Sequence, residues 1–331
     1  MRRILKAKEP EIRYVPGGIN VEAEGLENLK EMIVETHISS QTKNCYMSGE
    51  KASVDQSNLF FIDLDGLKIH VYDSSKGHSY QSPLTMIFLH GSPGQISNWK
   101  YQISYFEERY RVVAYDQRGY GRSDKPVKVT LKDYLDDLTS LMNKLNISAD
   151  DAVLVGHSFG GMVAQAYARD HAVKGLVLIG SLIKIKPDII DKIVWNLPPI
   201  FWRKLFFTEN PLTRKVYRDL FFSPSTSDEI FEEFIQDNKE YLESLPAHAF
   251  RYLKFFQDYD ASRWLPEVKA PTLVIVGEDD KVTPKDESVK IHELLPNSRL
   301  SILERAGHLI LYERADDLNN IIDEFIRELN I

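Results

Sequence analysis

The sequence predicts an α/β protein built on a mostly parallel sheet of eight strands, with a helical insertion. Short continuous runs of Val, Ile and Leu recur from residue 59 onward, helical stretches lie between them, and the interval from 182 to 268 interrupts the alternation. Continuous apolar runs are typical of strands buried on both faces of a parallel sheet. Strands that alternate with helices are typical of α/β domains.

The first 57 residues are polar and weakly patterned. Leu26, Leu29, Met32 and Ile33 share one helical face, which predicts a short amphipathic helix near residues 23–35. This helix could pack on the main domain, form part of a homodimer contact or cover the functional site. Packing on the main domain is the expected role, and 1–57 is interpreted as an N-terminal extension.

The pattern changes at Leu59. The stretch Leu59–Leu64, then Asp65-Gly66, then Leu67–Tyr72 predicts a β-hairpin with an Asp-Gly turn. Six apolar runs follow and predict buried strands: Leu84–Leu89, Arg111–Tyr115, Ala152–Val155, Gly175–Ile179, Thr272–Val276 and Arg299–Leu303. Helices are predicted near 97–107, 130–145, 159–169, 284–295 and 315–329.

The interval 182–268 has helical patterning and many aromatic residues. We interpret it as a helical cap inserted into a core made of residues 58–181 and 269–331, and we expect its aromatics to line an apolar pocket. Much of the same aromatic content must also form the core of the cap itself.

Composition excludes several classes of protein. The net charge is −8 and no long stretch is basic, which argues against a nucleic-acid partner. No apolar run approaches the length that spans a bilayer, and Cys45 is the only cysteine, so no intrachain disulfide forms. We therefore expect a cytoplasmic protein without a membrane span. The sequence has no P-loop, dinucleotide fingerprint or convincing metal cluster, so we expect no cofactor and no metal.

The strongest motif is Gly156-His157-Ser158-Phe159-Gly160, which follows the run Ala152–Val155 and precedes an Ala-rich helical stretch. It matches G-x-S-x-G, the pattern that holds a nucleophilic serine on a tight strand-to-helix turn. A side chain at Gly156 or Gly160 would collide with neighbouring backbone on such a turn. The motif predicts Ser158 as the nucleophile, with both glycines supporting it.

A serine hydroxyl is a weak nucleophile and needs a base. This type of turn predicts the chain order serine, acid, histidine, which leaves His292 and His308. His292 lies in the middle of a predicted helix. His308 follows the last strand in a loop preceded by Gly307, where a side chain would face a crevice at the carboxyl end of the sheet. His308 is therefore the predicted base.

The base needs a carboxylate to hold its tautomer and stabilise the imidazolium. An acidic turn with Glu278, Asp279 and Asp280 follows the strand Thr272–Val276, and any one of its three carboxylates can serve.

The oxyanion of an acyl-transfer reaction needs N–H donors. The loop His90-Gly91-Ser92-Pro93-Gly94 follows the strand Leu84–Leu89 and can offer the Ser92 N–H, while the turn at Ser158 can offer the Phe159 N–H. We expect His90 and Gly91 to support this loop. The second glycine-rich turn, Asp116–Ser123, is assigned a scaffolding role.

These motifs resemble those of the α/β-hydrolase superfamily, in the capped branch that contains esterases, epoxide hydrolases, C–C hydrolases and proline iminopeptidases. The resemblance covers about residues 59–331 and rests on His90–Gly94, Asp116–Ser123, Gly156–Gly161, Gly277–Pro284 and Gly307–Glu313. It implies the α/β-hydrolase fold. It also implies that Asp280 is the acid, since the family pattern puts the acid there, and a rival position after the sixth strand offers no carboxylate before Asp188.

Departures from the family patterns narrow the expected activity. Epoxide hydrolases and haloalkane dehalogenases use an aspartate nucleophile, whereas this chain has Ser158. Proline iminopeptidases usually carry an additional glycine after the loop histidine and a tryptophan after the nucleophile, where Ser92 and Phe159 stand here. C–C hydrolases typically have a longer glycine-rich oxyanion loop.

We expect a serine esterase that cleaves carboxylic esters of apolar, small to medium substrates through an acyl-enzyme. An apolar cap favours neutral substrates because burying an unpaired charge is costly. The alternatives are a proline iminopeptidase-type aminopeptidase, a C–C bond hydrolase, and a ligand-binding protein that does not turn over. An aminopeptidase needs a carboxylate for the substrate ammonium, and the interval offers Glu209, Glu232, Glu233, Glu240 and Glu243.

Overall fold

The computed structural model describes residues 13–15, 18–20, 52–76, 78–185 and 208–329, and these form two separate units, Met1–Glu50 and Lys51–Ile331. In the first unit, strands β1 (Arg13–Val15) and β2 (Gly18–Asn20) pair antiparallel, which the sequence did not predict. The helix predicted near 23–35 and Cys45 lie outside the described residues.

The second unit contains an eight-stranded sheet in the order β10-β9-β8-β7-β5-β6-β4-β3. The pairs from β10 to β6 are parallel, and β4 and β3 add antiparallel at one edge. The strands are β3 (Leu59–Leu64), β4 (Leu67–Asp73), β5 (Thr85–Leu89), β6 (Arg111–Tyr115), β7 (Ala152–His157), β8 (Gly175–Ile179), β9 (Thr272–Gly277) and β10 (Ser298–Leu303). The predicted fold class, a mostly parallel eight-stranded α/β sheet, is confirmed.

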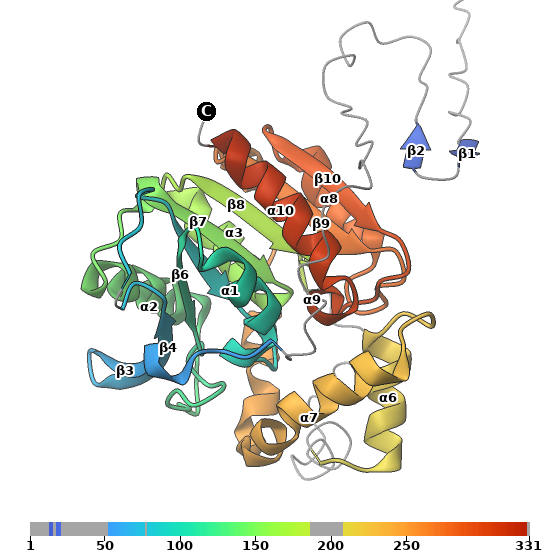
Figure 1. Ribbon diagram of the computed structural model, residues 1–331, viewed down its shortest axis with the longest axis horizontal. Coiled ribbons are helices and arrows are strands. Elements are labelled where there is room, and N and C mark those ends of the chain that lie inside the picture. The colour runs from blue at the N-terminus through green and yellow to red at the C-terminus, as the bar shows by residue number, and fades with distance from the viewer. Residues whose placement is uncertain (1–12, 16–17, 21–51, 77, 186–207, 330–331) are drawn as a thin grey trace, which may run out of the picture. The chain divides into compact units, whose positions relative to one another are not determined.

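Helices cover both faces of this sheet (Figure 1). α1 (Lys100–Phe106) packs with α10 (Ala315–Leu329), and α2 (Leu131–Lys144) packs with α3 (Phe159–Asp170). The other core helices are α8 (Lys285–Leu294) and α9 (Ile310–Glu313), and short 3-10 turns span Gln56–Asn58, Ile96–Trp99, Ala149–Asp151, Ala247–Arg251, Leu253–Phe256 and Leu265–Glu267.

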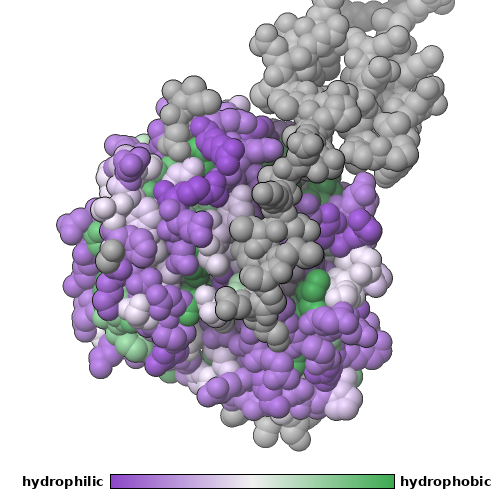
Figure 2. Space-filling view, in the orientation of Figure 1, coloured by the Kyte–Doolittle hydropathy of each residue, from purple (hydrophilic) through white to green (hydrophobic). Residues whose placement is uncertain are grey.

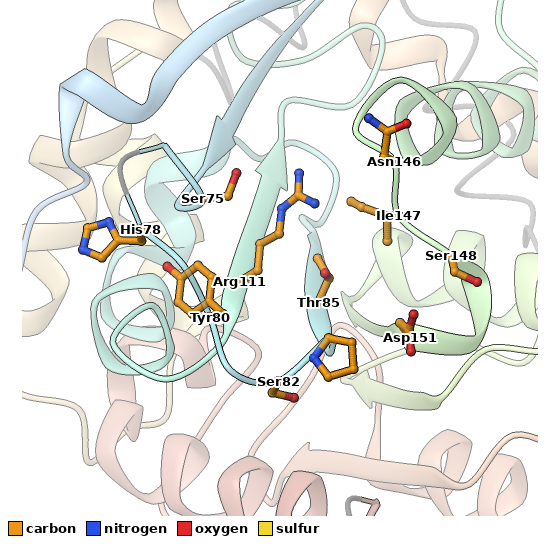
Figure 3. A pocket seen from close by; sticks show the side chains of 11 residues that line it. Ser75, His78, Tyr80, Ser82, Thr85, Arg111, Asn146, Ile147, Ser148 and Asp151 are labelled. Atoms are coloured by element: carbon orange, nitrogen blue, oxygen red, sulfur yellow. The ribbon is translucent and has the colours of Figure 1, made fainter.

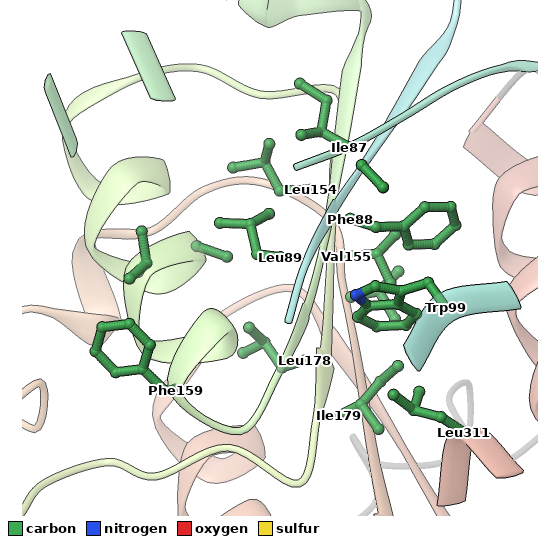
Figure 4. Close-up of a cluster of buried hydrophobic side chains, with 14 of the residues drawn as sticks. Ile87, Phe88, Leu89, Trp99, Leu154, Val155, Phe159, Leu178, Ile179 and Leu311 are labelled. Carbon is green, nitrogen blue, oxygen red and sulfur yellow. The ribbon is translucent and has the colours of Figure 1, made fainter. Parts of the chain in front are cut away.

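The core consists of the apolar side chains that the central strands present to these helices. Every residue of β5, β7 and β8 is buried. Figure 4 shows Trp99 and Leu311 packed on one side of the central strands and Phe159 on the other. The rings of Phe88 and Trp99 stack with their centroids 4.8 Å apart. Burial on both faces explains why these strands carry continuous apolar runs rather than alternating patterns.

The described part of the predicted insertion, 182–185 and 208–268, is mainly helical. It contains α6 (Pro211–Phe221) and α7 (Asp228–Ser244). Asn210 caps α6 by accepting from the N–H groups of Leu212 and Thr213, and proline follows at the first helical position, where its missing N–H costs nothing. Ser227 caps α7 in the same way. Residues 186–207 of the predicted cap lie outside the described residues.

A buried lysine joins α7 to the core. The Lys100 ammonium lies 2.6 Å from Oε1 of Glu233 and 2.6 Å from Oδ2 of Asp237, and its side chain is 6% exposed. The Tyr101 hydroxyl donates to the same Glu233 oxygen, at 2.7 Å. Since both carboxylates belong to α7, this cluster fixes the helix over the start of α1.

The surface in view is largely hydrophilic, with apolar residues in small separate areas (Figure 2). Among the residues that the structure describes, the large apolar side chains that are exposed are Phe61, Val127 and Leu212, and they come from three separate segments. No helix in the described ranges is both long enough and apolar enough to cross a membrane.

Replacing Lys100 with Met should lower the free energy of unfolding by about 2 kcal/mol or more, because Glu233 and Asp237 lose a shared buried cation. The same replacement at Lys132, whose ion pair with Asp136 is exposed, should change it by less than about 0.5 kcal/mol. Urea denaturation followed by circular dichroism measures both. Equal losses in the two variants would contradict the role assigned to Lys100.

Candidate active site

Ser158 lies on a sharp turn between β7 and α3. Its backbone has φ 52° and ψ −117°, a conformation that non-glycine residues rarely adopt and that stores strain. The N–H of Ser158 donates to the carbonyl of Ile179, at 2.8 Å, and its own carbonyl accepts from the N–H of Gly161, at 3.0 Å. These bonds to β8 and to α3 hold the strained turn in place.

The two glycines of this turn are required by the close approach of the backbone. A Cβ atom on Gly160 would lie 2.1 Å from the carbonyl oxygen of Leu89, at the end of β5. A Cβ atom on Gly156 would lie 2.5 Å from the carbonyl oxygen of Gly160. Both distances are far below van der Waals contact, so the spacing of glycines in the motif follows from the packing of α3 against two strand ends.

The structure brings Asp280 and His308 together. Asp280 lies in the turn after β9 and His308 in the loop after β10, and Oδ2 of Asp280 is 2.8 Å from Nδ1 of His308. Both side chains are almost fully buried, at 1% and 5% exposed. An ionised carboxylate only accepts, so Nδ1 of His308 carries the proton and donates. This leaves Nε2 of the neutral ring as the basic nitrogen.

Thr283 and the turn backbone orient the Asp280 carboxylate. Its Oδ1 accepts from the N–H groups of Val282 and Thr283, at 2.9 and 2.8 Å, and the Thr283 hydroxyl donates to Oδ2, at 2.7 Å. Burial alone would raise the pKa of Asp280, but His308 and the donors from Thr283 outweigh burial and lower the pKa below its ordinary value. Asp280 is therefore ionised at neutral pH. Sequence reasoning missed Thr283.

His157, the residue before Ser158, ties the turn to the His308 loop. Its Nε2 donates to the carbonyl oxygen of His308, at 2.8 Å, and the two rings lie 4.7 Å apart. Burial, together with the nearby His308, lowers the pKa of His157 to about 3, so this ring is neutral and its Nε2–H is available to donate. Sequence reasoning missed this role, although a polar ring in a buried strand end was a usable signal.

The hydroxyl of Ser158 makes no hydrogen bond to His308 among the described residues. Hydrogen bonds of this kind often form only when a substrate is bound. What the structure does show is that the neighbour of Ser158 contacts both the ring and the main chain of His308. The two residues therefore belong to one packed unit.

His90 joins the loops after β5 and β6. Its Nε2 accepts from the N–H of Gln117, at 2.9 Å, so Nδ1 carries the proton and donates to the carbonyl of Gly91, at 2.7 Å. The Gln117 side chain donates to the carbonyl of His90, at 2.7 Å. Burial lowers the pKa of His90 and keeps the ring neutral. His90 and Gly91 therefore lie where a supporting role was predicted.

Tyr120 reaches the predicted oxyanion loop from the turn after β6. Its hydroxyl lies 2.6 Å from Oγ of Ser92, and its buried ring meets His90 edge to face. Phe159 is the first residue of α3, so its N–H has no partner within the helix. No acceptor for the Ser92 N–H occurs among the hydrogen bonds of the described residues.

The turn Asp116–Ser123 contains a buried carboxylate that holds three segments. Oδ1 of Asp116 accepts from the N–H of Ile96, at 2.7 Å, and Oδ2 accepts from the N–H of Arg122, at 2.8 Å. Nδ1 of His70, on β4, also lies 2.8 Å from Oδ2. These contacts agree with the scaffolding role that the sequence suggested.

A cavity of about 260 Å³ lies at the amino ends of β5 and β6, away from the strand ends that carry the site (Figure 3). Thr85 and Arg111 line it, and they are the first residues of β5 and β6, whereas Ser158 follows the last residue of β7. Arg111 is already paired with Asp73. This cavity is therefore separate from the residues around Ser158. No group of three His, Cys, Asp or Glu side chains in the described segments could hold a metal ion.

Known proteins resemble this chain over most of its length. Residues 85–315 match the family described as alpha/beta hydrolase fold. A proline iminopeptidase of Thermoplasma volcanium is 27% identical over 288 residues, 81% of this chain and 96% of the relative. A 2-hydroxy-6-oxononadienedioate/2-hydroxy-6-oxononatrienedioate hydrolase of Comamonas testosteroni is 28% identical over 283 residues, 80% of this chain and 92% of the relative.

Among solved structures, a thermophilic esterase from Thermogutta terrifontis matches with a TM-score of 0.68 and 25% identity. The match covers 82% of this chain and 99% of the esterase. The names of these relatives state different activities, so the similarity identifies a family without identifying a substrate.

The low pKa of His157 should be visible in the pH dependence of stability. Between pH 6.5 and about 3 the folded chain keeps this ring neutral, while the unfolded chain protonates it, so its contribution to stability is lost as the pH falls through that window. Replacing His157 with Gln should reduce the slope of unfolding free energy against pH by up to about 1.4 kcal/mol per pH unit.

Urea denaturation at several pH values between 4 and 7 measures this slope. The same replacement at the exposed His78 is the control and should keep the wild-type slope. An unchanged slope in the His157→Gln variant would show that the ring is not held neutral.

Proposed function

The chain belongs to the alpha/beta hydrolase family, and we propose that it is a serine hydrolase that cleaves carboxylic esters of apolar, small to medium substrates through an acyl-enzyme. The observation that carries this proposal is the arrangement around Ser158. A strained serine turn shares one packed unit with a buried, hydrogen-bonded Asp280–His308 pair.

In the proposed mechanism, Oγ of Ser158 attacks the ester carbonyl and Nε2 of His308 takes the hydroxyl proton. Asp280 holds the Nδ1–H tautomer and stabilises the imidazolium that forms. The N–H groups of Ser92 and Phe159 stabilise the oxyanion. His308 then returns the proton to the leaving alcohol, which gives the acyl-enzyme. Attack by water, with His308 again as base, releases the carboxylic acid and restores Ser158.

Apolar rings around this site favour a neutral substrate. The ring of Phe159 lies 4.9 Å from that of Phe256, and the ring of Phe221 lies 6.0 Å from that of His308. Both Phe221 and Phe256 come from the insertion. An unpaired charge buried among such rings would lose its hydration without compensation, which supports esters with apolar acyl and alcohol parts.

Aminopeptidase activity is the chief alternative, since one relative is named a proline iminopeptidase. It needs a carboxylate in the site for the substrate ammonium. The carboxylates that the sequence offered have partners in the protein: Glu233 pairs with Lys100, and Glu209 and Glu232 pair with Arg214. Glu240 is exposed, and Glu243 interacts with Lys239. This pairing supports the esterase proposal over the aminopeptidase.

A substrate panel tests the proposal. We expect p-nitrophenyl butyrate to be hydrolysed much faster than proline or alanine p-nitroanilide, and Ser158→Ala to abolish the hydrolysis because the nucleophile is lost. A fluorophosphonate should add once per chain, at Ser158, as measured by intact mass and peptide mapping.

Each alternative has its own outcome. Faster anilide cleavage that is lost in a Glu→Gln variant of the insertion would establish an aminopeptidase. Labelling that survives Ser158→Ala would refute Ser158 as the nucleophile. Absence of both turnover and labelling in the wild-type chain would indicate a binding protein that keeps the triad geometry.

The neighbouring carboxylates Asp280 and Asp279 provide a matched pair. Asp280→Asn should lower kcat on the order of 1000-fold or more, because an amide no longer fixes the Nδ1–H tautomer of His308. Asp279→Asn should have a much smaller effect, since Asp279 accepts from Ser223 rather than from the histidine. Steady-state kinetics on p-nitrophenyl butyrate decides. The reverse order of effects would mean that Asp279 is the acid.

A further inference from the structure

A segment of the insertion lies between the acid turn and the base loop. This segment, residues 221–226, begins at the last residue of α6. The carbonyl of Phe221 accepts from the N–H groups of His308 and Leu309, at 2.9 and 3.1 Å. On the other side, the Ser223 hydroxyl donates to Oδ2 of Asp279, at 2.6 Å. The insertion therefore contacts the main chain of the proposed base as well as its ring.

Glu313, the last residue of α9, joins the same two regions through its carboxylate. Its Oε2 accepts from the N–H of Gly307, the residue before His308, at 2.7 Å. Its Oε1 accepts from the N–H of Ser223, at 2.6 Å, and from the hydroxyl of Thr226, at 2.5 Å. Glu313 is only 8% exposed, so one buried side chain connects the histidine loop to segment 221–226.

The chemistry of this contact requires an ionised carboxylate. All three partners are donors, and a carboxylate is the side chain that can accept at both ends. A glutamine in its place would turn an N–H₂ group toward the backbone N–H of either Gly307 or Ser223, and that N–H would lose its acceptor. Burial outweighs the three donors and raises the pKa of Glu313 above its ordinary value. The side chain thus serves as a two-sided acceptor rather than as part of an ion pair.

We propose that Glu313 is a positioning residue that couples the position of segment 221–226 to the alignment of His308. This inference rests on the proposed function, because it concerns the base of that reaction. When the segment lies as it does here, Glu313 and the Phe221 carbonyl fix three consecutive N–H groups, those of Gly307, His308 and Leu309. Displacement of the segment removes the acceptor for two of these groups and two donors from Glu313.

The coupling predicts a specific kinetic signature. Glu313→Gln should lower kcat about tenfold or more, because the buried N–H of either Gly307 or Ser223 loses its acceptor and the link between the histidine loop and segment 221–226 is broken. KM should change less than about twofold, because Glu313 has no role in substrate binding in this proposal. Thr226→Val, which removes one donor on the insertion side and keeps the bond to Gly307, should lower kcat about two- to fivefold.

The measurement must separate misalignment from loss of folded protein. Active sites are titrated with the fluorophosphonate, and kcat for p-nitrophenyl butyrate is expressed per titrated site. Thermal unfolding of each variant shows that it is folded at the assay temperature. A merely destabilised variant keeps the wild-type rate per site, whereas a misaligned base lowers that rate. Glu328→Gln is the matched control, since Glu328 is 56% exposed on α10, and should behave as wild type.

The outcomes distinguish this inference from the proposed function. A wild-type kcat per site in the folded Glu313→Gln variant overturns the coupling and leaves the serine hydrolase proposal intact. Failure of the wild-type chain to label or turn over overturns the proposed function and this inference with it. If Glu313→Gln does not fold, Thr226→Val decides, because an unchanged rate per site in that variant overturns the coupling and a reduced rate supports it.

Discussion

The parallel hydrogen bonding of the central strands is the constraint on which the candidate site depends. Leu89 of β5 pairs with Gly156 of β7, and His157 pairs with Ile179 of β8. Leu303 of β10 pairs with Gly277 of β9 in the same sense. Because these strands run in one direction and in register, the loops after them all begin at the carboxyl ends of the strands. The serine turn, the acid turn and the histidine loop, which are far apart in the sequence, therefore lie on the same side of the sheet.

Hydrogen bonds between buried polar groups then fix these loops relative to one another. His90 links the loops after β5 and β6, His157 links the serine turn to the His308 loop, and Glu313 links that loop to the insertion. Each contact satisfies a group that would be costly to bury alone. Moving one loop therefore leaves unpaired polar groups in at least one other. Fully satisfied buried networks of this kind make the loops around Ser158 and His308 rigid.

The strands and turns could be predicted because local sequence patterns determine them. The hydrogen-bond partners could not, because they depend on which loops meet in the folded chain. Apolar runs placed the strands to within one or two residues, and the Asp65-Gly66 turn forms with positive φ at both residues. Gly156 and Gly160 of the serine turn were predictable because close backbone contacts exclude a side chain at each position. By contrast, nothing near His157 or Glu313 in the sequence indicates their partners, which lie 151 and up to 90 residues away along the chain. Lys100 is buried for a similarly distant reason, because α7 supplies two carboxylates.

Bond specificity in this fold must arise outside the three groups that perform acyl transfer. A serine, a histidine and two N–H donors act on the carbonyl of an ester and of an amide alike, so relatives with different activities can share them. Relatives can differ in the side chains that the insertion places beside that carbonyl. Here Glu209, Glu232 and Glu233 of the insertion pair with cations of the protein, while Phe221 lies beside the histidine. A substrate ammonium would have to displace a protein cation from such a pair, whereas a neutral ester displaces none. Under the proposed function, pairs such as Glu233 with Lys100 favour neutral esters, a preference that the nucleophile and base cannot set themselves.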